Sequence, residues 1–176
     1  MKHSLLLIYS YIVRVSTYFF PDIPFLMSFR GFLYSLGMKS SGRNFQVSSS
    51  ALIRGLQFLS VGENVFVAHN CTILAGCSVS IGSNVLVGVG SVITDGNHSY
   101  KDKTGYRFGL SKRKPVVILQ GSWIGGNCVV LPGSEFPQNS VLAANSTYRM
   151  RSDDENSLFS GNPAVFIKYF HREVKY

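Results

Sequence analysis

The stretch SVGENVFVAHNCTILAGCSVSIGSNVLVGVGSVIT, residues 60–94, repeats with a period of six residues. A large apolar residue opens each hexad, and the residue four places later is small or β-branched in nearly all of them. Thirteen apolar positions follow the rule: Val47, Ile53, Val61, Val67, Ile73, Ile81, Val87, Ile93, Ile118, Ile124, Val130, Phe136 and Leu142. An amphipathic helix would repeat every 3.6 residues and a half-buried strand every two, so the pattern indicates neither.

A period of six has a direct physical interpretation. Each hexad supplies a short strand whose apolar side chain points to the axis of a prism, and a tight corner of Gly or Asn follows, because these residues tolerate left-handed backbone angles. Three hexads make one triangular coil of parallel strands, and coils must stack to bury their apolar faces. The sequence therefore predicts an all-β chain that forms a parallel β-helix. Gln57 and Asn97 are exceptions at the small position.

The three cysteines support this interpretation. Cys71, Cys77 and Cys128 all fall at the small position of a hexad. An odd, sparse set does not form a disulfide framework. We expect structural, metal-free thiols in a protein of a reducing compartment.

The repeat stops after Thr94 and resumes at Ile118. The interruption, residues 95–117, opens with Asp95, Asn97 and His98 and then becomes strongly basic. Long insertions without structure of their own are usually functional in compact domains. Imidazole accepts protons near neutral pH, so His98 is the candidate general base of this loop.

Length and charge limit the remaining choices. A chain of 176 residues fits one domain with a sizeable core. The net charge of +8 favours an acidic partner. Zinc-finger spacings and RNA-binding aromatic motifs are absent from the sequence, which argues against nucleic acid.

The two ends of the chain are expected to be helical. Residues 4–20 are mostly apolar, carry a single charge at Arg14, and have a narrow polar stripe of Ser10, Arg14 and Thr17 at helical spacing. Such a helix is about 25 Å long and would not cross a hydrocarbon core of about 30 Å. Packing against protein is the preferred interpretation, and contact with a membrane interface is the alternative. Residues 164–176 are expected to form a second helix. The predicted division is 1–42, helical; 43–168, β-helix; and 169–176, helical tail.

Over residues 43–168 the pattern resembles the hexapeptide-repeat acyltransferase superfamily, whose coils are left-handed. The lead-in FRGFLYSLG, residues 29–37, is similar to that of enzymes that acetylate capsule, O-antigen or exopolysaccharide sugars. The resemblance implies acetyl-CoA as co-substrate, a sugar hydroxyl as acceptor and a homotrimer. The cysteines favour a cytoplasmic, metal-free protein, and association with the inner face of the plasma membrane is the alternative that the first helix leaves open. The basic loop favours an acidic acceptor.

The resemblance also implies roles for residues near the expected acetyl group. His98 matches the histidine that precedes an extruded loop in sugar O-acetyltransferases, and Asp95 and Asn97 beside it are expected to contact the acceptor. Relatives carry an active-site asparagine at the position of Ala68. Asn70, two residues later, is expected to take its place in contacting the acceptor. Trp123 either walls the acetyl channel or seals the seam between subunits.

Four positions are implied for the donor. The N–H of Gly126 matches a group that faces the thioester carbonyl, and Ala144 matches a position that lines the pantetheine arm. Arg149 and Met150 stand where relatives have Thr-Lys, so Arg149 or Arg151 is expected to make the phosphate contact there. Lys168, after the Gly161–Ala164 turn, matches a basic residue near the CoA phosphates.

Three other functions are compatible with, or close to, this fold. N-acetylation of an amino group on a nucleotide-linked sugar would use the same fold. A catalytically silent scaffold would not need His98. A γ-class carbonic anhydrase needs three zinc-binding histidines, two of them close in sequence, whereas no other histidine lies within ten residues of His98.

Overall fold

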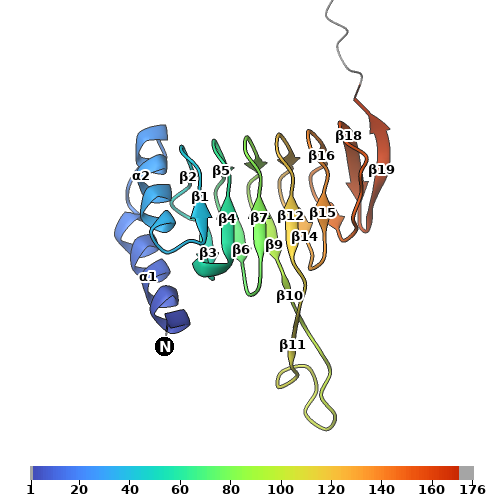
Figure 1. Cartoon of the computed structure of the whole chain (residues 1–176), viewed down its shortest axis with the longest axis horizontal. Helices are drawn as coiled ribbons and strands as arrows, with labels where there is room; N and C mark the ends of the chain where they lie inside the picture. The colour runs from blue at the N-terminus through green and yellow to red at the C-terminus, as the bar shows by residue number, and fades with distance from the viewer. Residues whose placement is uncertain (1, 171–176) are drawn as a thin grey trace, which may run out of the picture.

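The computed structural model describes residues 2–170 and shows a parallel β-helix capped by two helices at its N-terminal end (Figure 1). Two α-helices, α1 (Lys2–Thr17) and α2 (Pro24–Ser35), come first. The coils follow, with one short 3₁₀ turn at Leu56–Phe58. The predicted β-helix is confirmed.

Three parallel sheets form the faces of the prism, and strands six residues apart lie on successive faces. The first sheet contains β1 (Ser40–Ser41), β4 (Leu59–Val61), β7 (Val79–Ile81), β12 (Val116–Ile118) and β15 (Glu135–Phe136). The second contains β2 (Gln46–Val47), β5 (Phe66–Val67), β8 (Leu86–Val87), β13 (Trp123–Ile124), β16 (Val141–Leu142), β18 (Ser157–Gly161) and the antiparallel β19 (Ala164–Tyr169). The third contains β3 (Leu52–Arg54), β6 (Thr72–Leu74), β9 (Val92–Thr94), β14 (Val129–Val130) and β17 (Thr147–Tyr148).

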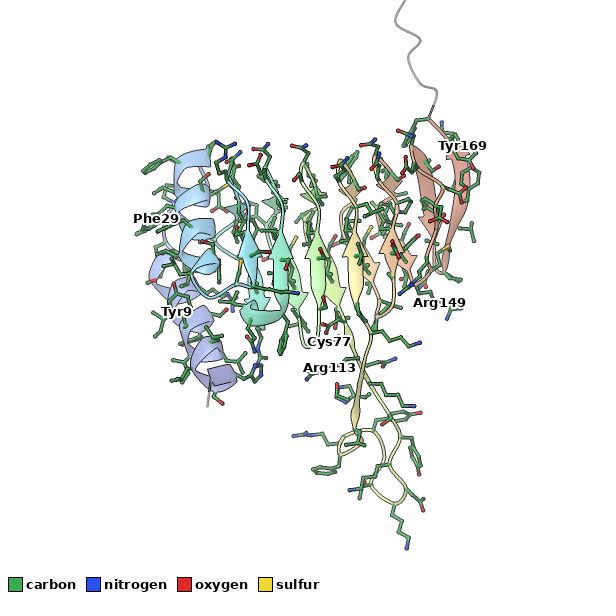
Figure 2. The ribbon with its side chains drawn as sticks, viewed as in Figure 1. Tyr9, Phe29, Cys77, Arg113, Arg149 and Tyr169 are labelled. Carbon is green, nitrogen blue, oxygen red and sulfur yellow. The ribbon has the colours of Figure 1, made fainter. Side chains whose placement is uncertain are left out.

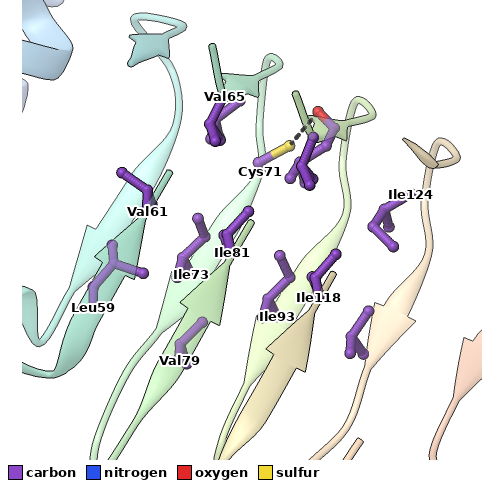
Figure 3. Packing of buried hydrophobic residues seen from close by; sticks show 14 of the residues in the cluster. Leu59, Val61, Val65, Cys71, Ile73, Val79, Ile81, Ile93, Ile118 and Ile124 are labelled. Carbon is purple, nitrogen blue, oxygen red and sulfur yellow. Dashed lines mark hydrogen bonds between the residues drawn. The ribbon is translucent and has the colours of Figure 1, made fainter. Parts of the chain in front are cut away.

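All thirteen predicted axial residues are buried. Figure 3 labels Val61, Ile73, Ile81, Ile93, Ile118 and Ile124 among them. The axial series continues through Tyr148 and Phe159, which the hexad search missed. With Phe136 they form an edge-to-face aromatic cluster, with ring centroids 4.8–5.6 Å apart. These larger side chains fill the axis at the C-terminal end.

The corners are built as the sequence predicts. Left-handed backbone occurs at Asn64 (φ 55°), Asn84 (φ 59°) and the equivalent corner asparagines and glycines. Stacked asparagine side chains are hydrogen-bonded, with Asn64 Nδ2 donating to Asn84 Oδ1 at 3.1 Å. The corners are therefore stabilised from coil to coil as well as within each coil.

The expected C-terminal helix is wrong for the residues that the structure describes. Residues 164–169 form β19, which runs antiparallel to β18 after the Gly161–Ala164 turn. Val165, Phe166 and Ile167 favour strands, and the open edge of β18 offers them backbone partners. Residues 171–176 lie outside the described part of the chain.

The insertion also differs from the expected structureless loop. It is a hairpin arm of β10 (Gly96–His98) and β11 (Ser111–Arg113), and it projects from the turn between the third and first sheets (Figure 1). Between residues 2 and 170, no helix is both long and apolar enough to cross a membrane.

The thiols should react slowly with alkylating reagents at neutral pH. Cys71 and Cys128 are buried, and burial raises the pKa of each thiol, so less of the reactive thiolate is present. Cys77 is half-buried, and its pKa is raised by burial and then by the neighbouring Asp95. In native protein, mass spectrometry should show Cys77 labelled first and the other two slower by about tenfold or more. Rapid labelling of Cys128 without unfolding would contradict this assignment.

Candidate active site

The hairpin arm is fixed to the β-helix by Asp95, whose side chain is 1% exposed. Its carboxylate accepts hydrogen bonds from the backbone N–H groups of Gly76 (2.8 and 2.9 Å), Cys77 (2.6 Å) and Ser78 (2.7 Å). The N–H of Lys114 donates to the Asp95 carbonyl at 2.9 Å and closes the base of the arm. This geometry supports a structural role for Asp95; its expected contact with the acceptor stays a prediction.

The two strands of the arm present different side chains to its two faces. Gly96 pairs with Arg113, Asn97 with Lys112, and His98 with Ser111. Because paired residues share a face and successive residues alternate, His98 and Arg113 belong to one face and Lys112 to the other. The candidate base His98 and the positive charge of Arg113 are thereby placed on the same side.

The His98 face borders a pocket that is also lined by Leu7 of α1. Arg54, Thr94, His98, Ser111 and Arg113 contribute to its lining. Arg113 lies across the neighbouring corner, where its Nη1 donates to the Gly76 carbonyl and its Nε to Ser111 Oγ at 3.4 Å. The His98 imidazole is exposed and has no hydrogen-bond partner among the described residues. It is accessible to an incoming hydroxyl in a pocket lined by two arginines.

The opposite face of the arm borders a second, basic hollow. It is lined by Asn97, Lys112, Lys114, Leu131, Pro132 and Arg149. Figure 2 shows Arg113 and Arg149 on opposite sides of the base of the arm. The arm therefore separates two groups of cations: Arg113 with Arg54 on the His98 face, and Lys112 and Lys114 with Arg149 on the other. The sequence did not reveal this division.

Gly126 and Ala144 lie at a different corner, the turn between the second and third sheets. Their neighbours Gly125 and Ala143 donate backbone hydrogen bonds to the next coil, at 2.8 Å each. Within residues 2–170, the N–H groups of Gly126 and Ala144 donate no hydrogen bond. The two amides are stacked in successive coils and can bind a ligand that runs along this corner.

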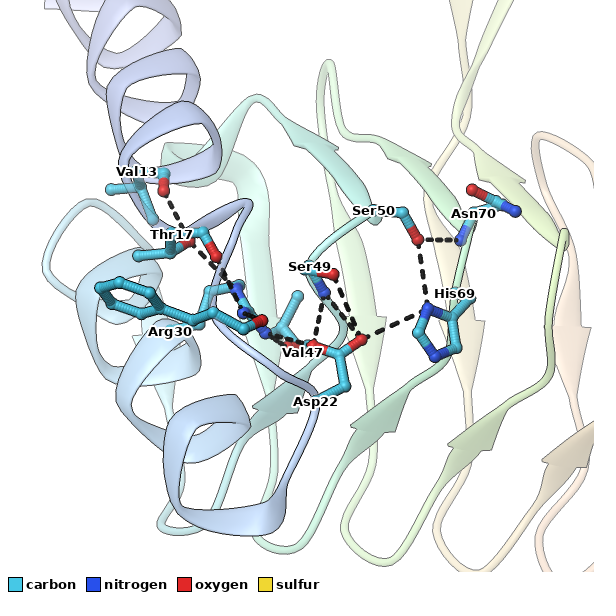
Figure 4. Close-up of polar contacts among 10 residues, drawn as sticks. Val13, Thr17, Asp22, Arg30, Val47, Ser49, Ser50, His69 and Asn70 are labelled. Carbon is cyan, nitrogen blue, oxygen red and sulfur yellow. Dashed lines mark hydrogen bonds and ion pairs between the residues drawn. The ribbon is translucent and has the colours of Figure 1, made fainter.

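Asn70 belongs to this same corner, where its backbone is left-handed (φ 56°) and its N–H donates to Ser50 Oγ at 3.0 Å. The adjacent His69 is held by the Asp22 carboxylate, 3.3 Å from its Nδ1. Asp22 also pairs with the buried Arg30 at 3.0 Å (Figure 4). This network ties the helical cap to the corner, and no sequence motif pointed to Asp22.

The remaining predicted residues are separated from His98 within one chain. Trp123 is half exposed on the outer surface of the second sheet, where its neighbours in the ladder are Leu86 and Val141. Lys168 is exposed on β19 and pairs with Leu158. One chain thus brings together Asp95, Asn97 and His98, but it does not bring the expected donor contacts Gly126 and Ala144 to them.

The cysteines and the other potential metal ligands do not gather into a metal site in the described residues. In residues 2–170, no three His, Cys, Asp or Glu side chains are grouped so that they could hold an ion. The buried Cys71 and Cys128 instead direct their Sγ atoms to main-chain carbonyls, those of Gly88 and Ala143, at 3.0 Å.

Sequence comparison finds acetyltransferases as relatives, and no protein-family model matches the chain. A "Probable macrolide acetyltransferase" of Lysinibacillus sphaericus is 34% identical over 96 residues, which cover 46% of this chain and 53% of the relative. A "Putative lipopolysaccharide biosynthesis O-acetyl transferase" of Escherichia coli is 43% identical over 60 residues, covering 34% and 30%. The chain spans about half or less of the length of these relatives.

The fold is shared with solved acetyltransferases. A hexapeptide-repeat-containing acetyltransferase of Vibrio cholerae, complexed with acetyl-coenzyme A, superposes with a TM-score of 0.81 at 22% identity, covering 96% of this chain and 89% of that one. A galactoside acetyltransferase in complex with coenzyme A gives 0.82 at 22% identity, covering 94% and 81%. The coils therefore have the left-handed β-helix architecture of these proteins.

Proposed function

We propose that this chain, built on the hexapeptide-repeat acetyltransferase fold, transfers acetyl from acetyl-CoA to a sugar hydroxyl, with His98 as general base. The proposed acceptor is a bacterial capsule, O-antigen or exopolysaccharide, or its precursor. The observation that carries the proposal is the exposed His98 imidazole in a pocket lined by arginines, at the point where the coils are interrupted. The relative named for lipopolysaccharide O-acetylation supports this acceptor class.

The chemistry needs one base and one oxyanion donor. A nitrogen of His98 takes the acceptor's hydroxyl proton while the hydroxyl oxygen attacks the thioester carbonyl carbon. The carbonyl oxygen becomes negative and accepts a hydrogen bond from the Gly126 N–H, which is not otherwise used as a donor in the described residues. The carbon–sulfur bond then breaks, and the CoA thiolate recovers the proton from the imidazolium. The products are the acetyl ester and free CoA.

A site shared between copies resolves the separation of these groups. His98 projects from the third–first corner and Gly126 from the second–third corner. In an assembly with threefold symmetry, one corner of each copy meets a different corner of the next. We propose that His98 of one copy faces Gly126 and Ala144 of its neighbour, and that Trp123 lines the seam between them.

The protein should accordingly be a homotrimer in solution. Sedimentation equilibrium should give close to three times the 19.4 kDa chain mass at assay concentration. Mixing His98→Ala chains with Gly126→Pro chains should restore part of the activity, because mixed trimers contain some intact pairs of residues. A fully active monomer would contradict the shared site.

The division of cations predicts separate effects on the two substrates. Arg113→Ala should raise the KM for an acidic acceptor, whereas Lys112→Ala with Lys114→Ala should raise the KM for acetyl-CoA. Each effect should be about tenfold, the size of a lost charge-assisted hydrogen bond. Lys168→Ala should also raise the acetyl-CoA KM with little change in kcat, the pattern of lost uniform binding.

Initial-rate kinetics at low salt, where screening is least, should separate these effects. Lys103→Ala at the tip of the arm is the matched control, since it removes one positive charge far from both pockets. An Arg113 variant that changes only the acetyl-CoA KM would assign both groups of cations to the donor. It would also remove the argument for an acidic acceptor.

The acceptor class is tested by incubating the protein and acetyl-CoA with a panel of saccharides, followed by mass spectrometry. O-acetyl esters, which mild alkali removes, are the expected products. Alkali-stable acetyl groups on a nucleotide-linked amino sugar would favour N-acetylation, and absence of transfer to any glycan would overturn the proposal. The free cysteines and the use of acetyl-CoA lead us to propose a cytoplasmic location.

A further inference from the structure

The helix α1 is oriented with its polar stripe toward the protein. Ser10, Val13 and Thr17 are its buried residues. The Ser10 hydroxyl donates to the Ile53 carbonyl, and Thr17 Oγ1 accepts a hydrogen bond from Arg30 at 3.0 Å. The polar stripe predicted from the sequence is thus the side of α1 that packs against the rest of the protein. Its apolar residues are left on the outside.

These outer residues follow helical spacing and make a continuous strip. The exposed members are Leu5, Ile8, Tyr11, Ile12, Val15 and, just beyond the helix, Tyr18 and Phe19. Phe19 is 89% exposed. Residues spaced by three and four lie on one face of a helix, so the strip runs along the side opposite Ser10 and Thr17.

The helix α2 repeats this arrangement. Its buried side contains Met27, Arg30, Gly31 and Tyr34. A side-chain carbon at Gly31 would lie 1.7 Å from the Phe45 carbonyl oxygen, so α2 is pressed closely onto the first coil. Phe25, Phe29, Phe32 and Leu36, again at helical spacing, are exposed on the opposite side. Figure 2 shows Phe29 on the side of α2 turned away from the coils.

Charge distinguishes this surface from an ordinary protein-binding patch. The first 42 residues contain one acidic residue, Asp22, and its carboxylate is largely buried in the pair with Arg30. Two exposed cations lie close to the helices: Lys39 follows α2 in the chain, and Arg54 lines a hollow together with Leu7 and Tyr11 of α1. An apolar, aromatic-rich helical face bordered by cations and free of exposed acids fits the interface of an anionic bilayer. Two such faces docked together would instead bring like charges close.

We propose that the outer surface of α1 and α2, hereafter the cap face, docks peripherally on a membrane that contains anionic phospholipid. The aromatic and aliphatic side chains enter the headgroup and acyl boundary, and the surrounding cations contact lipid phosphates. Figure 1 shows both helices at one end of the β-helix, so docking leaves the sides of the coils and the arm free. The inference goes beyond the proposed function, because binding to lipid needs no acetyl transfer.

Vesicle co-sedimentation tests the proposal. The full chain should pellet with vesicles of phosphatidylethanolamine and phosphatidylglycerol, and less with neutral phosphatidylcholine vesicles. The double variant Phe19→Ser with Phe25→Ser should bind at least about tenfold more weakly, because both rings would lose their apolar insertion. These are the most exposed phenylalanines of the cap, at 89% and 76%, so the fold should survive.

The matched control removes two exposed apolar side chains at the other end of the chain, Val165 (53% exposed) and Ile167 (49%). Val165→Ser with Ile167→Ser on β19 should leave binding unchanged, as should His98→Ala, which separates lipid binding from catalysis. Three results would overturn the proposal: no binding of the wild type to anionic vesicles, equal binding by the Phe19/Phe25 variant, or a lipid-free assembly larger than a trimer that this variant abolishes. The last would identify a second copy as the occupant. Circular dichroism confirms that each variant is folded.

Discussion

Replacing His98 with alanine should lower kcat by about 10²- to 10⁴-fold, the usual contribution of a general base. The fold and the trimer should be unaffected, because the imidazole is exposed and makes no hydrogen bond within the described residues. The KM for acetyl-CoA should change little, since the side chain acts on the acceptor hydroxyl. Steady-state kinetics with the acceptor found by the saccharide panel provide the measurement.

A rescue experiment makes this prediction specific. Removal of the His98 ring leaves space at the mouth of its pocket, so added imidazole should restore part of the rate. His98→Gln offers a matched control, because glutamine preserves polarity and approximate size without accepting a proton near neutral pH. If either variant retains near-normal kcat, His98 is not the base and the site must be sought elsewhere on the coils.

Replacing Asp95 with alanine should destabilise the protein by at least about 3 kcal/mol, because three backbone N–H groups would lose their acceptor at a cost of about 1–3 kcal/mol each. Those groups belong to Gly76, Cys77 and Ser78, all within 2.9 Å of the carboxylate. Urea denaturation should show the loss as a lower midpoint. Turnover should also fall, since the arm that holds His98 starts at this residue.

Two controls isolate the role of the carboxylate. Asp95→Asn retains one acceptor oxygen and should lose less stability than Asp95→Ala. Asp102→Ala removes an exposed carboxylate from the same arm and should change stability by no more than about 0.5 kcal/mol. A loss below about 1 kcal/mol for Asp95→Ala would show that water or a neighbouring group can replace the carboxylate.

The fold could be predicted because each coil obeys a local rule. The axial residue of a hexad, such as Ile73 or Ile118, can be recognised from its own spacing, and it is buried once neighbouring coils stack. The C-terminal strand could not be predicted in this way. Val165 and Ile167 are compatible with either structure alone, and the open edge of β18, a non-local partner, decides between them.

The site was predictable only in part, because it too depends on non-local partners. The break in the hexads identified His98, but the hydrogen-bond register of the arm decides which basic residue accompanies it. That register pairs Gly96 with Arg113, and so puts Arg113 beside His98 and Lys112 on the opposite face. Likewise, hydropathy identified the first helix, but the orientation of its polar stripe depended on partners such as Arg30 and the Ile53 carbonyl.

The antiparallel return of β19 also has a consequence for how the coil stack ends. Parallel coils present backbone groups that another coil, or another molecule, can continue by adding strands, as happens in fibrils. A strand of reversed direction covers the last rung of the second sheet and is a poor template for a further coil. Chains shortened before Ala164 would lose this terminator. The edge of β18 would then be open for pairing with another chain, even where every remaining coil is correctly folded.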